Sequence, residues 1–87
     1  MKLDLSHIKN PAMGWDVVVQ ATAEGGEKIS SATVTVNGAT VAQESLDNVS
    51  TWTRTLRRQG YYPGKNTVQA EITNDKGEDT SGEDTWE

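Results

Sequence analysis

The sequence predicts an all-β fold in which about seven antiparallel strands form a two-layered sandwich. Four segments alternate between apolar and polar side chains with a period of two, which is the pattern of strands that bury one face. Turn-forming residues separate the segments at spacings expected of a sandwich or barrel, and no segment offers a sustained helical face. The chain contains no cysteine, so such a sandwich rests on burial without an inter-sheet disulfide.

Two strands are predicted at the start of the chain. A weak alternation through Leu3 and Leu5 predicts a first edge strand over residues 1–8. Residues 15–23 carry apolar side chains at odd positions and mostly polar side chains at even positions, and only Val18 breaks this pattern. We therefore expect the odd-numbered side chains of the second strand to face the core.

A β-hairpin is predicted from residues 31–36 to residues 39–43. The first segment alternates and stops at Asn37 and Gly38, a dipeptide that favours two-residue turns. Val41 is the expected inward residue of the return strand. Because two-residue loops fix register, substitution of Gly38 by a β-branched residue is expected to disturb strand pairing.

The strand predicted over residues 50–58 has one charged side chain on its apolar face. Trp52 and Leu56 share that face, and Arg54 lies between them. Two interpretations follow. Either Arg54 lies at the margin of the sheet with its stem packed and its charged head in water, or the strand bends at this position.

The last two segments complete the set of strands. Residues 66–73 place Val68 and two further apolar side chains on one face, which predicts a central strand. Residues 78–87 are nearly all polar, so they form either a last edge strand pinned by Trp86 or a frayed tail. We favour the strand because leaving a Trp in water is costly. Turn signals separate the predicted strands at residues 24–27, 47–48, 59–64 and 74–77.

Residues 51–56 and 61–77 read TWTRTL and YYPGKNTVQAEITNDKG. These segments resemble the second half of bacterial immunoglobulin-like domains, in which a Trp strand precedes a Pro-Gly or Ala-Gly corner, an Asn-x-Val-x-Ala strand and a Thr-Asp-x-x-Gly turn. The resemblance implies an immunoglobulin-like β-sandwich with Greek-key connections and with Trp52 packed at its core or margin. The chain departs from the family at Asn74, where an Asp is frequent, so the calcium sites of some adhesin repeats are not carried over.

The resemblance also implies a range of functions. Such domains are appended to adhesins, to secreted glycosidases and to capsid or tail proteins of tailed bacteriophages, and fold alone does not fix function. We interpret residues 1–87 as a single domain, expected to be a module of a larger protein or virion assembly at a virion or cell surface. The expected role is non-catalytic display or interaction, with weak binding to host-surface glycan or protein. The alternative is a structural spacer or accessory domain of a secreted carbohydrate-active enzyme or adhesin.

The charge of the chain argues against two kinds of partner. The formal net charge is -5, with 13 acidic and 8 basic residues. Neutralising phosphates requires a basic surface, so we expect no nucleic-acid binding, and the same argument disfavours anionic membrane surfaces. No stretch approaches the length of a membrane-spanning helix, so we expect no membrane insertion.

The residues offer little for catalysis. The single His of the chain, His7, is next to Ser6 and near Asp4, but neighbours in an extended strand point to alternating faces. Adjacency in sequence therefore does not make a catalytic triad. We predict an edge-strand or surface His, no catalytic residue and no cofactor.

One acidic segment could be considered as a metal site. Asn74, Asp75, Glu78 and Asp79 form the candidate cluster, with Asp84 a further acid. Their spacing does not match the EF-hand pattern, and a run of acids commonly forms a solvated face that discourages edge pairing. We therefore predict no metal site.

The predicted binding site lies where the third alternating segment ends. Arg57 and Arg58 are followed closely by Tyr61 and Tyr62, and Arg and Tyr are enriched in binding surfaces. The alternative is an Arg-rich edge strand that deters aggregation. Trp15 is assigned a structural role instead, because it opens an apolar strand face.

Overall fold

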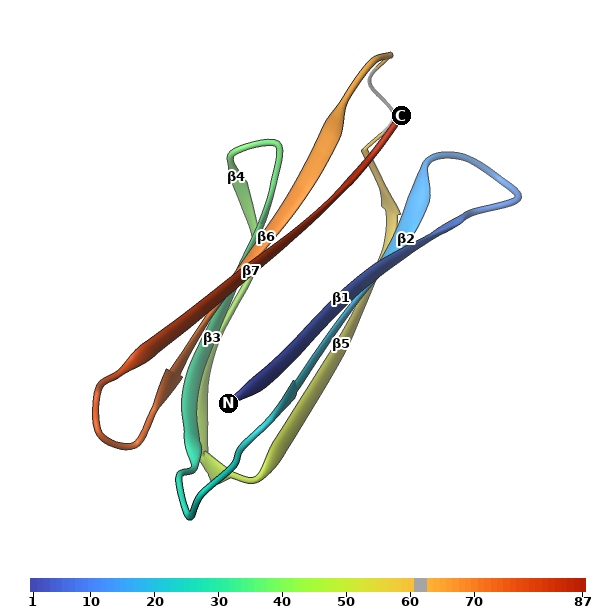
Figure 1. The fold of residues 1–87 in the computed structure, drawn as a ribbon. Helices are drawn as coiled ribbons and strands as arrows, with labels where there is room; N and C mark the ends of the chain where they lie inside the picture. Colours follow the sequence, from blue (N-terminus) through green and yellow to red (C-terminus); the bar gives the residue numbers. More distant parts are fainter. Residues whose placement is uncertain (61–62) are drawn as a thin grey trace.

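Seven antiparallel strands form two sheets in the computed structural model, which describes residues 1–60 and 63–87 (Figure 1). The described residues contain no helix long and apolar enough to cross a membrane. The three-stranded sheet has the order β1-β2-β5 and the four-stranded sheet the order β4-β3-β6-β7. The strands are β1 (Lys2–Lys9), β2 (Trp15–Thr22), β3 (Ile29–Val36), β4 (Ala39–Val49), β5 (Thr51–Gln59), β6 (Asn66–Asn74) and β7 (Asp79–Trp86).

The strand order is that of an immunoglobulin-like sandwich. The order β1-β2-β5 matches the A-B-E strands of such domains, and β3-β6-β7 matches the C-F-G strands. The fourth strand, β4, pairs with β3 instead of with β5. The chain crosses between sheets after β2, β4 and β5, and the predicted all-β, antiparallel, cysteine-free sandwich is confirmed.

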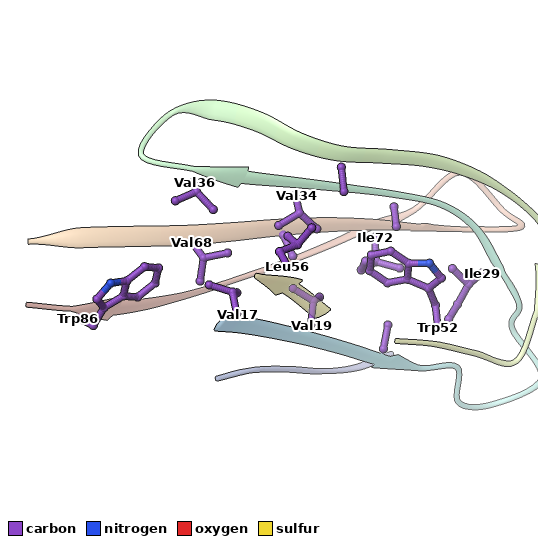
Figure 2. Packing of buried hydrophobic residues seen from close by; sticks show 14 residues of the cluster. Val17, Val19, Ile29, Val34, Val36, Trp52, Leu56, Val68, Ile72 and Trp86 are labelled. Atoms are coloured by element: carbon purple, nitrogen blue, oxygen red, sulfur yellow. The ribbon is translucent and has the colours of Figure 1, made fainter. Parts of the chain in front are cut away.

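The core lies between the two sheets, with the rings of Trp52 and Trp86 toward its opposite ends (Figure 2). The buried residues of β2 are at odd positions, as predicted, and β6 lies between β3 and β7 as the predicted central strand. Burial of each Val, Ile or Leu side chain stabilises the fold by roughly 1.5–3 kcal/mol. The buried apolar residues are Val17, Val19, Ala21, Ile29, Ala32, Val34, Val36, Ala42, Trp52, Leu56, Val68, Ala70, Ile72 and Trp86.

The predicted hairpin joins β3 to β4. Asn37 has φ 50° and Gly38 has φ 83°, so both central residues adopt the left-handed conformation that this tight turn requires. The Asn37 side chain reinforces the turn, because its Oδ1 accepts the backbone N–H of Thr67 at 2.9 Å. The turn therefore ties the hairpin to β6.

The return strand differs from the prediction in its inward residue and in its length. A register shift falls between Val34, which pairs with Ala42, and Thr35, which pairs with Thr40. The extra residue of this bulge inverts the alternation, so Ala42 is buried and Val41 is only half-buried. Val41 still packs against the core, as predicted, but Ala42 is the residue that the return strand buries. The strand also continues to Val49, well beyond the predicted range of 39–43.

A polar side-chain pair joins the two sheets at each open edge of the sandwich. At one edge, Arg54 Nη1 of β5 donates a hydrogen bond to Glu44 Oε2 of β4 at 3.0 Å. The pairing of β5 with β2 continues without a shift through Arg54. This confirms that Arg54 lies at the sheet margin and that the strand does not bend there. At the other edge, His7 Nδ1 of β1 lies 2.5 Å from Asp84 Oδ2 of β7.

The first and last strands are edge strands, as predicted, and pack against each other. An ideal Cβ on Gly82 of β7 would lie 3.1 Å from side-chain carbons of both Leu3 and Leu5 of β1, so glycine permits this close approach. Trp86 is only 4% exposed. The end of the chain is therefore a strand pinned by its Trp and not a frayed tail.

Three of the four predicted turns can be compared with the described residues. Hydrogen bonds close the turns at residues 24–27 and 74–77, from the N–H of Glu27 to Glu24 O and from the N–H of Gly77 to Asn74 O, both at 3.1 Å. The turn predicted at residues 47–48 lies slightly later in the structure: both residues belong to β4, Asn48 adopts φ 48° near its end, and the chain bends at Ser50. The turn at residues 59–64 includes residues 61–62, which are outside the described part.

Candidate functional site

The predicted arginines lie in a β-bulge at the end of β5. Trp15 pairs with Gln59 and Val17 pairs with Leu56, so one residue of β2, Asp16, lies opposite two residues of β5, Arg57 and Arg58. Arg58 adopts φ 60° within this bulge. A left-handed conformation is uncommon for a residue other than glycine, and it allows β5 to hold the extra residue.

The bulge decides where the Arg58 side chain goes. Strict alternation from Trp52 and Leu56 would place Arg58 on the inner face of the sheet. In the structure Arg57 and Arg58 are both exposed, and the Arg57 side chain is 74% exposed. The extra residue therefore presents two neighbouring guanidinium groups to solvent.

Asp16 of β2 holds the bulge. Its Oδ1 accepts the backbone N–H of Arg58 at 3.2 Å and the Nδ2 of Asn10 at 2.8 Å, while its Oδ2 lies 3.8 Å from Arg57 Nη1. The hydrogen bond from Asn10 lowers the pKa of Asp16, and the N–H of Arg58 and the charge of Arg57 act in the same direction. The carboxylate thus stays ionised at neutral pH and leaves the positive charges only partly compensated.

Asn10 is itself fixed by the loop between β1 and β2. It is buried, its Oδ1 accepts the N–H of Ala12 at 2.8 Å, and its own N–H donates to Gly14 O at 3.0 Å. The carboxylate that holds the bulge is therefore oriented by an ordered loop.

Two exposed apolar side chains lie at the same end of the three-stranded sheet. Ile8 pairs with Asp16 across β1 and β2 and is 67% exposed, and Met13 in the connecting loop is 55% exposed. We call the surface formed by Ile8, Met13, Asp16, Arg57 and Arg58 the bulge patch. It combines apolar contact area with guanidinium groups that can bind carboxylate or phosphate bidentately.

Tyr61 and Tyr62, the other two predicted binding residues, are outside the described residues. Sequence reasoning missed Ile8, Met13 and Asp16 as members of this surface. Ile8 could have been found from parity, because Leu3 and Leu5 place odd positions of β1 inward and so direct Ile8 outward. The sequence contains no comparable signal for Asp16, whose partners lie on other strands.

His7 lies on an edge strand, as predicted, and contacts residues far away in sequence. Besides its contact with Asp84, its ring centroid is 5.3 Å from the centroids of both Trp15 and Trp86. Ser6, its neighbour in sequence, is exposed and pairs with Val18, an even-numbered residue of β2. The structure thus brings His7 together with rings and one carboxylate, and leaves Ser6 on the opposite face of β1.

The acidic segment near Asn74 forms a hydrogen-bonded turn. Asn74 Oδ1 accepts the N–H groups of Lys76 and Glu78, both at 2.9 Å. Its Nδ2 donates to Glu27 Oε1 at 3.1 Å and to Glu78 Oε1 at 2.9 Å. Within residues 1–60 and 63–87, no group of three or more His, Cys, Asp or Glu side chains is arranged to hold a metal ion.

Glu27 links this turn to the amino terminus. Its Oε2 lies 2.6 Å from the amino nitrogen of Met1, and Glu24 Oε1 lies 3.1 Å from the same nitrogen. The hydrogen bond from the amino terminus, followed by that from Asn74, lowers the pKa of Glu27 to about 2. This corner is a structural network at the opposite end of β1 from the bulge patch.

Comparisons with known proteins add no assignment. No family model matches the chain, and neither a curated protein nor a solved structure matches it. The description of the fold therefore rests on the strand order and the core of this structure, and the description of the candidate site rests on its geometry.

Proposed function

We propose that the chain is a non-catalytic immunoglobulin-like module of the bacterial type that serves in display or interaction. Its setting would be a phage virion, as a capsid decoration or tail protein, or a bacterial surface protein active in cell adhesion. The module would bind weakly to glycan or protein on a host cell surface through the bulge patch. The observation that carries this proposal is the outward position of Arg58 in a left-handed bulge held by Asp16.

The backbone of Arg58 supports a binding role. A non-glycine residue in the left-handed region costs of order 1–3 kcal/mol, and such residues cluster at binding sites. A glycine at position 58 would relieve that cost but would remove one guanidinium from the surface. Arginine at this position is therefore explained better by contact with a partner than by the stability of β5.

The composition of the bulge patch supports weak and selective contact. Exposed ion pairs contribute about 0–1 kcal/mol each, so two arginines in water give modest affinity. The exposed side chains of Ile8 and Met13 add apolar area beside the charges. The net charge of -5 on the whole chain limits nonspecific association with anionic surfaces.

The assignment to the bacterial immunoglobulin-like family is part of the proposal. It is supported by the positions of the residues that carry the resemblance. Trp52 is 8% exposed at one end of the core, and the Val68 and Ala70 of the Asn-x-Val-x-Ala segment are buried on the central strand. Ser6 lies on the opposite face of β1 from His7, so these neighbours do not form a pair of nucleophile and base, which is in keeping with a non-catalytic role.

Binding to a glycan array and to host cells tests the proposed function. The purified chain is compared with the double variant Arg57→Ser and Arg58→Ser, and with the control Lys2→Ser and Lys76→Ser, which removes the same charge from two exposed positions. We expect saturable binding that the arginine variant loses and the lysine variant keeps. Equal binding by the parent and the arginine variant would remove the bulge patch from the proposal.

A structural spacer is the second candidate, and one observation favours it. The two termini lie toward opposite ends of a sandwich whose principal extents are 41, 21 and 18 Å (Figure 1). A chain that enters at one end and leaves at the other can separate two neighbours, as an accessory domain of a secreted carbohydrate-active enzyme or adhesin would. No binding by the parent protein to the array or to cells would favour the spacer.

A further inference from the structure

The outer face of the four-stranded sheet contains a groove of about 510 Å³. Its polar lining comes from the outward positions of β3, β6 and β7, which alternate with the buried residues of the core. The residues that line it are Thr33, Thr35, Gln69, Ala70, Glu71, Ser81, Gly82 and Glu83. This sheet face has hydroxyl and carboxylate groups but no aromatic or basic side chain among these lining residues.

Two carboxylates stand diagonally opposite each other in the groove. Gln69 pairs with Glu83 and Glu71 pairs with Ser81, which makes Glu71 and Glu83 diagonal neighbours about 7–8 Å apart. Glu83 accepts a hydrogen bond from Gln69 Nε2 at 3.3 Å. Glu71 has no hydrogen bond or ion pair within the described part of the chain. Its exposed carboxylate is therefore available to bind a cationic group of another molecule.

The opposite sheet carries the complementary charges. Arg57 and Arg58 are adjacent and exposed at the end of β5, and Arg58 makes no side-chain hydrogen bond or ion pair with the described residues. We propose that the groove docks Arg57 and Arg58 of a second copy of this chain. The inference rests on the proposed function in one respect, namely that the bulge patch is an interaction surface.

Charge complementarity selects a second copy as the occupant. Arg57 and Arg58 supply two positive charges for the two carboxylates of the groove, and guanidinium binds carboxylate in a bidentate geometry. The hydroxyls of Thr33, Thr35 and Ser81 offer acceptors for the remaining guanidinium N–H groups. The same chain therefore supplies both halves of the contact.

The two halves lie on outer faces of different sheets, and this fixes the type of assembly. A contact between different surfaces of identical chains is heterologous, so it repeats from copy to copy and forms an open line or a ring. The contact is small and solvent-exposed, so a single pair associates weakly. Many copies held side by side on one surface would reinforce it through effective concentration.

Sedimentation velocity of the purified chain over a dilution series tests the docking. We expect reversible self-association at about 50 mM NaCl that weakens at about 500 mM NaCl, because salt screens exposed charges. The variants Arg57→Glu with Arg58→Glu, and Glu71→Lys with Glu83→Lys, should each weaken self-association roughly tenfold or more. An equimolar mixture of the two variants should associate again, because each supplies the charge that the other lost.

The control is the double variant Lys2→Glu and Lys76→Glu, which reverses two exposed charges outside both surfaces and should associate like the parent. Circular dichroism melts of every variant separate loss of docking from loss of folding. A chain that remains monomeric at low salt, or a mixture of the two variants that does not associate, would overturn the inference.

A short Arg-Arg peptide identifies a different occupant. If it binds the parent but not the Glu71→Lys and Glu83→Lys variant, while the parent stays monomeric, the groove takes another basic protein and self-docking is wrong. The same groove variant keeps Arg57 and Arg58, so its binding to glycans or cells tests the proposed function separately. If the groove variant still binds glycans or cells and the parent does not self-associate, the docking inference is wrong and the proposed function is unaffected.

Discussion

Asp16 Oδ1 and the backbone N–H of Arg58 form a hydrogen bond of 3.2 Å that joins β2 to the bulge of β5. The left-handed residue is thus held by a carboxylate from a neighbouring strand, which Asn10 orients in turn. The bulge and the loop between β1 and β2 form one unit, and the exposed arginines depend on both.

Replacement of Asp16 is expected to disorder the bulge patch. Asp16→Ala removes the acceptor for Arg58 and leaves the buried amide of Asn10 without its carboxylate partner. We expect a lower melting temperature and a large shift of the Arg58 amide resonance in NMR spectra. Asp4→Ala, at an exposed position of β1, serves as the control and should leave both unchanged. An unshifted Arg58 amide in the Asp16 variant would contradict this account.

Two glycines with nearly equal positive φ angles should respond differently to substitution. Gly60 has φ 61° and an added Cβ would lie 2.5 Å from Trp86 Cζ2, whereas Gly25 has φ 60° with no atom within 4 Å of an added Cβ. Both alanine variants bear the backbone cost, but Gly60→Ala also displaces the Trp86 ring. We expect Gly60→Ala to be less stable than Gly25→Ala by about 1–3 kcal/mol in chemical denaturation. Equal free energies of unfolding would show that the ring moves freely.

The buried indole N–H of Trp86 has no hydrogen-bond acceptor in the part of the chain that the structure describes. Trp86→Phe retains most of the ring and removes the unpaired N–H, so we expect stability equal to or above that of the parent. Trp86→Ala loses the ring and should cost about 3–5 kcal/mol. Urea denaturation compares the three proteins, and a Phe variant as unstable as the Ala variant would refute the argument.

Stability at acid pH should depend on Glu27. Its pKa is about 2 in the folded protein against an ordinary value of 4.5, so the folded state favours the ionised form. The resulting stabilisation is complete above about pH 4.5 and is lost as pH falls toward about 2. Glu27→Gln should therefore flatten the dependence of the melting temperature on pH in that window.

The control for this pH dependence is Glu71→Gln, which alters a carboxylate without a hydrogen bond or ion pair in the described part of the chain. Acetylation of the amino terminus gives an independent check, because that group is the largest cause of the lowered pKa of Glu27. Parallel pH profiles for Glu27→Gln and the parent would show that the network at Asn74 does not contribute to acid stability.

Local patterns predicted most of the fold. Alternation located the strands, and Asn37 with Gly38 located the hairpin, because each signal depends on residues close in sequence. The prediction did not include the burial of Ala42, because a bulge in β4 inserts one residue and inverts the parity of the residues up to Leu46. No sequence pattern near Val41 predicts this register shift.

The candidate site was predicted only in part. Neighbours in sequence were enough to select Arg57 and Arg58, but their shared exposure depends on a register shift against β2. The contacts of Asp16 with Arg58 and of His7 with Asp84 join residues 42 and 77 positions apart. Such pairs form only when strands distant in sequence come together in the folded protein, so local sequence patterns do not predict them. The role of Arg57 and Arg58 in binding remains a prediction.

The packing of β1 on β7 has a mechanical consequence. These two strands belong to different sheets, and no backbone pairing between them occurs in the described residues. Their seam consists of side chains: His7 against Asp84, stacked rings, and Leu5 against Gly82. Because β1 and β7 run in the same direction, a tensile force applied to the two ends of the chain would load this seam in shear, and the first and last strands would slide past each other while the hydrogen-bonded sheets stayed whole.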